Sequence, residues 1–164
     1  MARRKWDLPG GEIRLDLGAL YPKQWQFIRS TARYTAYGGA RGGGKTHVLM
    51  RACIRGALRY PGIRILILRR TYPELEQTII QPMNRLISGA TMDGRPCGEM
   101  VASYSSTLRM LFFSNGSTVK FGHLQSAAAI TEYQGQEYDV IFLDEATHFT
   151  QYQFATLTAC LRGA

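Results

Sequence analysis

Apolar residues recur with two different periods along the chain, and these periods predict where helices and strands lie. Between His47 and Arg59, apolar residues recur at spacings of three and four, the period of an amphipathic helix. Two short runs, Ile63 to Leu68 and Val140 to Leu143, are almost wholly apolar. Such runs are expected of central strands that are covered on both faces. The chain therefore predicts a helix followed by two buried strands.

Weaker patterns complete the predicted order of elements. Tyr34-Thr35-Ala36-Tyr37 is short, aromatic and partly β-branched, so we interpret it as a buried strand. Ser114-Asn115-Gly116 lies between two apolar runs and predicts a β-hairpin. A helix begins at Thr71 or Tyr72, and Pro82 is expected to kink or break it. The remaining predictions are a helix from Pro22, a loop over residues 88–98, a short helix over 126–133 and a helix over 152–161.

Strands that alternate with helices predict an α/β fold, with the ligand at the carboxyl ends of the strands. The length of 164 residues suits one domain with a real core. No apolar run approaches the roughly 20 residues that span a bilayer, and the N-terminus does not read as a secretory signal. The three cysteines are far apart and form no C-x-x-C motif, which argues against a zinc site or a disulfide framework and suits a reducing cytoplasm.

Positive charge is concentrated in the first part of the chain. The net charge is +8, and residues 1–70 hold 15 Lys and Arg against 3 Asp and Glu, whereas residues 71–164 hold 5 against 9. This distribution indicates attraction to a polyanion, either a nucleotide or a nucleic acid. For Arg51, Arg55 and Arg59, which lie four apart on the predicted helix, a solvated basic face is an equal alternative.

Residues 39–46 read G-A-R-G-G-G-K-T and satisfy the phosphate-binding pattern G-x-x-x-x-G-K-[S/T]. Glycines let successive N–H groups point at phosphates, Lys45 reaches the β- and γ-phosphates, and the Thr46 hydroxyl holds Mg²⁺. A glycine-rich surface loop is the alternative, but the motif stands between a predicted strand and a predicted helix, as it should. The predicted nucleotide-binding residues of the loop are Gly39, Ala40, Arg41, Gly42, Gly43, Gly44, Lys45 and Thr46.

A carboxylate pair, Asp144-Glu145, directly follows the apolar run that ends at Leu143. An aspartate in this position holds Mg²⁺, and an adjacent glutamate can orient and deprotonate an attacking water. The alternative is an acidic cap on a following helix. Because the loop and the pair both follow strands, they are expected at one edge of the sheet, where Mg-ATP could bind both.

The ordered set of motifs resembles the N-terminal ATPase domain of the large terminase subunit of tailed bacteriophages, the motor that packages DNA. The residues that carry the resemblance are Leu20–Gln24, Gly38–Thr46, Leu68–Thr71, Tyr133–Asp139 and Val140–Ala146. Arginine inside the glycine loop is its most discriminating part. The resemblance implies a P-loop NTPase of the additional-strand, RecA-like type, with a mainly parallel central sheet flanked by helices, and it implies ATP and Mg²⁺ as cofactors.

The resemblance also implies roles for single residues. Gln24 matches the glutamine that contacts adenine, with an exposed helix residue as the alternative. Arg41 and Lys45 match residues that act on the phosphates during catalysis, although Arg41 could equally anchor the loop to a carboxylate. Asp144 matches the Mg²⁺-organising aspartate and Glu145 the catalytic glutamate.

Three further arginines are left open by the sequence. Arg69 and Arg70 could face DNA or a neighbouring subunit, or could cap a strand end in solvent. Arg162 could be an interface residue.

Residues 1–18 look like an N-terminal arm with little core. By resemblance, residues 19–164 form an incomplete ATPase domain, truncated before the coupling motif and the nuclease domain. The expected partners are double-stranded DNA, the portal protein, the small terminase subunit and further copies in a homo-oligomeric ring on the portal. The expected place is the host cytoplasm, on the procapsid and not at a membrane. A helicase-like nucleic-acid-dependent ATPase fragment and a non-hydrolysing nucleotide-binding assembly fragment are the alternatives.

Overall fold

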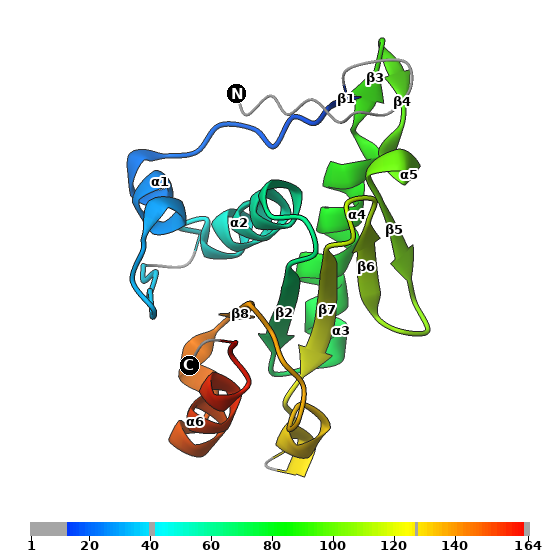
Figure 1. Cartoon of the computed structure of the whole chain (residues 1–164). Helices are drawn as coiled ribbons and strands as arrows, with labels where there is room; N and C mark the ends of the chain where they lie inside the picture. The colour runs from blue at the N-terminus through cyan, green and yellow to red at the C-terminus, as the bar shows by residue number, and fades with distance from the viewer. Residues whose placement is uncertain (1–12, 40–41, 127, 163–164) are drawn as a thin grey trace.

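The structure, a computed structural model, describes residues 13–39, 42–126 and 128–162, and its centre is a five-stranded sheet (Figure 1). The strands lie in the order β5-β6-β7-β2-β8. β2 pairs in parallel with β7 and β8, whereas β5 with β6 and β6 with β7 are antiparallel. The α/β class is confirmed, but the expected mainly parallel sheet is mixed, because hairpins add β6 and β5. The strands are β2 Arg64–Arg69, β5 Ala102–Ser105, β6 Met110–Phe113, β7 Thr118–His123 and β8 Val140–Leu143.

β2 lies inside the sheet and is buried on both faces, as its apolar run predicts. Side chains alternate between the faces of a strand. Ile65 and Ile67 therefore enter one hydrophobic cluster with α2 (Lys45–Arg59), while Leu66 and Leu68 enter a second cluster with α6 (Gln151–Ala159). The sheet is thus covered on its two sides by helices from distant parts of the sequence.

The helical segments follow the expected order, with one difference at Pro82. α3 (Tyr72–Leu75) leads through a π-helical turn (Glu76–Ile80) into α4 (Gln81–Ser88), and Pro82 lies in the first turn of α4. The expected break does not occur, because the backbone stays helical through this turn, whose hydrogen-bonded rings are wider than those of an α-helix. The other helical segments are α1 Pro22–Arg29, α5 Gly98–Val101, and the 3₁₀ turns Ala128–Glu132 and Ala146–His148.

The prediction of a plain loop over residues 88–98 is wrong. Two short strands, β3 (Thr91–Met92) and β4 (Arg95–Pro96), pair there, and β1 (Ile13–Arg14) adds to β3. Asp93 and Gly94 join the strands with φ of 50° and 76°. Asp-Gly is a favoured pair for such turns because both central residues need positive φ.

The prediction of a buried strand at Tyr34–Tyr37 is also wrong. This segment has no regular structure, and Tyr34 is 53% exposed. β8 is the last strand of the sheet, so among the described residues its outer edge pairs with no other strand. A four-residue segment cannot be a strand without a partner for its backbone groups, whatever its side chains favour.

Candidate nucleotide site at the carboxyl edge of the sheet

The described part of the glycine loop turns directly into α2. Gly44 has φ of 71° and precedes the first helical residue, Lys45. A Cβ on Gly44 would lie 2.7 Å from Nε2 of Gln24, which donates a 3.4 Å hydrogen bond to the Gly44 carbonyl. Both the left-handed backbone and the close approach therefore require glycine here. Ala40 and Arg41, two of the predicted loop residues, lie outside the described residues.

The glycine-loop helix and the end of β8 meet through one side-chain contact. The Thr46 hydroxyl lies 3.3 Å from both carboxylate oxygens of Asp144, although the two residues are 98 positions apart. Asp144 is only 5% exposed, and its backbone N–H donates to the Leu68 carbonyl of β2 at 2.9 Å. The expectation that the two motifs share one edge of the sheet is confirmed in its geometry.

Arg69, at the end of β2, holds both acidic residues. Its Nη1 donates to Asp144 Oδ2 at 2.5 Å and to Thr78 Oγ1 at 3.0 Å, and its Nη2 donates to Glu145 Oε1 at 2.9 Å. Its Nε lies 3.5 Å from a carboxylate oxygen of Glu74. Arg69 is buried, so it neither reaches DNA or a neighbour nor caps a strand end in solvent, and all three interpretations of it are wrong.

The role of Arg69 follows from the register of β2 and β8, which no motif in the sequence specifies. Leu68 pairs with Leu143 in this register, which brings the residue after Leu68 beside the residue after Leu143. Arg70 is exposed.

Glu145 is held in an unusual conformation with both oxygens engaged. Its φ and ψ of 55° and 50° are left-handed, a strained region for a residue other than glycine. Its Oε1 accepts from Arg69, and its Oε2 lies 3.3 Å from Nδ1 of His148, one turn later. The sequence did not single out His148.

Burial raises the pKa of the Asp144 carboxyl above its ordinary value. The nearby charge of Glu145 acts in the same direction, whereas Arg69 and the hydrogen bond from Thr46 oppose it. The charged form of Asp144 is thus incompletely compensated by this chain alone, so a cation bound beside it would lower that pKa.

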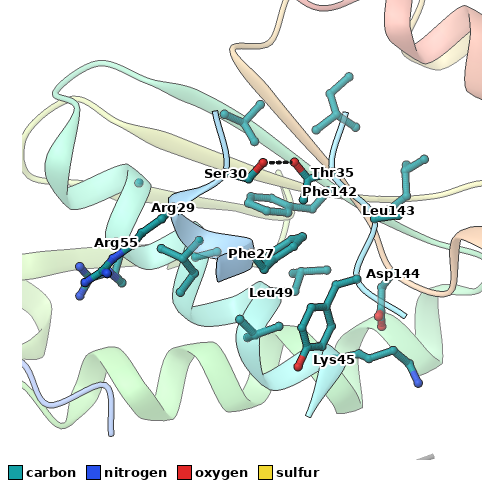
Figure 2. Close-up of a pocket in the computed structure, with 18 of the residues that line it drawn as sticks. Phe27, Arg29, Ser30, Thr35, Lys45, Leu49, Arg55, Phe142, Leu143 and Asp144 are labelled. Atoms are coloured by element: carbon teal, nitrogen blue, oxygen red, sulfur yellow. Dashed lines mark hydrogen bonds between the residues drawn. The ribbon is translucent and has the colours of Figure 1, made fainter. Parts of the chain in front are cut away.

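A large open cavity borders this edge, and Lys45 and Asp144 lie near each other at one end of it (Figure 2). The Lys45 ammonium donates to the Gly39 carbonyl at 2.7 Å, so the lysine folds over its own loop. Phe27 from α1, Leu49 from α2 and Phe142 from β8 line the cavity.

Three other singled-out residues have partners within the chain. Gln24 is 2% exposed and is not a solvent-facing helix residue; its Oε1 accepts from the Tyr21 N–H at 2.9 Å. Arg51 is buried and donates to the carbonyls of Leu17 and His47, unlike a solvated basic residue. Arg162 pairs with Glu137 at 3.2 Å.

The described residues contain neither a cluster of metal-ligating side chains nor a membrane-spanning helix. No group of three or more His, Cys, Asp and Glu side chains in residues 13–39, 42–126 and 128–162 could hold a metal ion by itself. No helix in the same ranges is long and apolar enough to cross a membrane.

Solved structures with the same fold exist. The large terminase of a thermophilic bacteriophage matches with a TM-score of 0.65 and 15% identity over 87% of this chain (crystal form 2). The same terminase in complex with ATP-gamma-S matches with a TM-score of 0.60 and 18% identity, also over 87% of this chain. This chain spans 36% of the length of each of these two terminase chains. None of the curated proteins matches.

Fold and site together define an α/β domain in which a glycine loop at a helix start faces a carboxylate pair at a strand end. A family model described as "Terminase large subunit, T4likevirus-type, N-terminal" matches residues 36–162, more than half of the chain. The chain belongs to this family of terminase large-subunit N-terminal domains.

Proposed function

We propose that this chain is the ATP-hydrolysing motor domain of a terminase large subunit, which drives double-stranded DNA into a procapsid. The observation that carries the proposal is the Thr46–Asp144 contact. It joins the start of the glycine-loop helix to the carboxyl end of β8, which is where an α/β sheet binds its ligand. Membership of the terminase family supports the assignment of the site to packaging.

The side chains at this contact fit Mg²⁺. A hydroxyl and a carboxylate are the hard oxygen ligands that Mg²⁺ prefers, and Mg²⁺ on a nucleotide takes only one or two protein ligands, with phosphates and waters completing its shell. Thr46 and Asp144 would hold the ion, and the bound ion would neutralise charge on the phosphates.

The remaining residues have distinct roles in the proposed reaction. The loop glycines present N–H groups to the phosphates, and Lys45 leaves the Gly39 carbonyl to bind them. Glu145 orients and deprotonates the attacking water. Gln24 supports the loop through Gly44 and would exchange its contact with the Tyr21 N–H or the Gly44 carbonyl to reach the adenine, and Arg41 acts on the γ-phosphate.

Glu145 must first exchange partners, because its two oxygens contact Arg69 and His148 in this structure. While both oxygens hold these contacts, neither is placed to accept a proton from an attacking water. This observation favours a second candidate function for the chain by itself, namely nucleotide binding without turnover.

We further propose that the sheet is of the P-loop, RecA-like type and is completed by a strand between Tyr34–Tyr37 and β8. The cavity is lined by residues 30–39 on one side and by 139–143 on the other, so it separates the two segments. All four β8 side chains remain partly exposed. This chain spans 36% of the length of the matched terminase chains, and the additional strand would come from a segment outside that shared stretch.

The proposed partners follow from the family: DNA, the portal protein, the small terminase subunit and further copies of the subunit in a ring on the procapsid in the host cytoplasm. Residues 1–18 would be an N-terminal arm, whose described part packs on the ATPase domain through β1 and Ile13.

Phosphate release and nucleotide binding test the function separately. Wild type, Glu145→Gln and Lys45→Ala are compared with and without DNA, with Glu99→Gln as a control at an exposed carboxylate outside the site. We expect Glu145→Gln to bind ATP but to release phosphate at least about a hundredfold more slowly, and Lys45→Ala to bind ATP weakly. Wild type that binds ATP without releasing phosphate would favour the second candidate, and unchanged ATP affinity in Lys45→Ala would overturn the site.

A further inference from the structure

Three arginines gather at the far end of α2 from the glycine loop, around two aromatic rings. The guanidinium carbons of Arg29 and Arg55 lie 5.0 and 4.8 Å from the centre of the Trp25 ring, and that of Arg59 lies 5.4 Å from the centre of the Tyr60 ring. Figure 2 shows Arg29 from α1 and Arg55 from α2 side by side. We call Arg29, Arg55 and Arg59 the α1–α2 arginine cluster.

The positive charges of this cluster are not neutralised within the described part of the chain. No described residue forms an ion pair or a side-chain hydrogen bond with any of the three guanidinium groups, whereas Arg69 and Arg162 pair with carboxylates. Burial lowers the pKa of Arg55 below its ordinary value, and repulsion from Arg59 and then Arg29 lowers it further. An external anion would relieve this repulsion.

Contact with an aromatic ring leaves guanidinium donors available. A guanidinium carries five N–H donors in a planar fork, and a ring on one side of it does not occupy them all. Arg55 and Arg59 are one helical turn apart, about 6 Å along α2. A strand of duplex DNA carries one phosphate per about 3.4 Å of helix axis, so two nucleotides rise by a similar distance.

We propose that the α1–α2 arginine cluster binds the phosphate backbone of duplex DNA without reading its sequence. This inference rests on the proposed function, because it names the surface through which the motor domain contacts its DNA. Planar guanidinium groups are the side chains best suited to phosphate oxygens. The cluster lies about ten residues, or roughly 15 Å, along α2 from Lys45, so DNA and nucleotide would occupy opposite ends of one helix.

A charge-matched pair of variants tests the surface. Arg29→Gln/Arg59→Gln removes two exposed charges of the cluster, and Arg85→Gln/Arg95→Gln removes two exposed charges elsewhere. Binding of a short fluorescein-labelled duplex of arbitrary sequence is followed by anisotropy between about 50 and 200 mM salt. We expect the cluster variant to bind roughly tenfold or more weakly and its slope of log K against log salt to flatten by about 1.8, two phosphate contacts, with little change in the control.

ATP affinity and self-association, measured on the same proteins, separate the possible failures. An equal loss of DNA affinity in the cluster and control variants, or no DNA binding by wild type, would contradict the proposed DNA-binding surface. Unchanged DNA binding with altered self-association in the cluster variant would also overturn it and would assign the cluster to a second copy of the chain. Wild type that binds DNA through the cluster but does not bind ATP would leave the surface in place and contradict the proposed function instead.

Discussion

At the scale of single residues, the site is organised by Arg69 as much as by the motif residues. The charges of a buried arginine and its two carboxylates compensate one another only while all three side chains are present. Removing one of them leaves an uncompensated charge in a place that excludes water. Motifs in the sequence identified Asp144 and Glu145, but no motif describes the residue that holds them. That residue could be found only from the register of β2 and β8, which depends on how the chain folds.

Replacing Arg69 by methionine is therefore expected to cost about 3 kcal/mol of the free energy of unfolding. The measurement is urea denaturation, with Arg70→Met as the control, because Arg70 is adjacent in sequence but exposed. Adding Asp144→Asn to Arg69→Met should recover part of the loss, since it removes the charge left without a partner. Equal losses in the two methionine variants would contradict the role of Arg69.

Alanine substitutions at two loop glycines are expected to distinguish the effect of backbone strain from the effect of a clash with Gln24. Gly42 and Gly44 both have left-handed φ, of 80° and 71°, but only at Gly44 would a Cβ meet another residue, namely Gln24. Each substitution should cost about 1 kcal/mol of strain. Gly44→Ala should in addition displace Gln24 and weaken ATP binding more than Gly42→Ala does. Nucleotide titrations check this, and identical affinities would show that the Gln24 contact does not support the loop.

At the scale of elements, the sequence predicted those whose signals are local. The period of α2, the apolar runs of β2 and β8 and the Asn115-Gly116 turn are all confirmed. The strand predicted at Tyr34–Tyr37 does not form, because a strand needs a neighbouring strand to pair with and this segment does not pair with β8. At Pro82 the helix does not break, since the π-helical turn leads without interruption into α4.

The packing of β7 on the second cluster gives a prediction at this scale. A Cβ on Gly122 would lie 2.1 Å from the Tyr133 hydroxyl and 2.8 Å from a methyl carbon of Leu68, so Gly122→Ala should destabilise the fold by about 3 kcal/mol. Gly56→Ala is the control, because its Cβ meets nothing closer than 3.8 Å and alanine favours the helix by about 0.5–1 kcal/mol. Thermal unfolding of both variants should show shifts of opposite sign. A stable Gly122→Ala protein would show that Tyr133 moves freely.

At the scale of the whole molecule, the described sheet ends at β8, a strand whose apolar residues are typical of a strand inside a sheet. The apolar residues of β8 pack on both hydrophobic clusters, Val140 and Phe142 on one and Ile141 and Leu143 on the other. A strand covered on both faces is normally central, whereas an edge strand usually carries charge or proline. The sequence predicts the strand itself correctly, but its place at the edge depends on what lies across the cavity, which local patterns do not contain.

Hydrogen exchange along β8 should report this open edge directly. In a strand paired on one side only, every second amide donates to its neighbour and the others face outward. The Asp144 N–H donates to the Leu68 carbonyl at 2.9 Å, so by alternation the Phe142 and Asp144 amides should exchange slowly and those of Ile141 and Leu143 quickly. Exchange followed by NMR on the 164-residue chain measures this pattern, with the central strand β2 as the reference for protection on both sides.

A longer terminase chain that supplies the proposed strand should slow the Ile141 and Leu143 amides to the rate of β2, because both would then donate to the added strand. Uniform protection of β8 in the shorter chain would mean that a segment such as Tyr34–Tyr37 already pairs with it, and the proposed strand would then have no edge to bind.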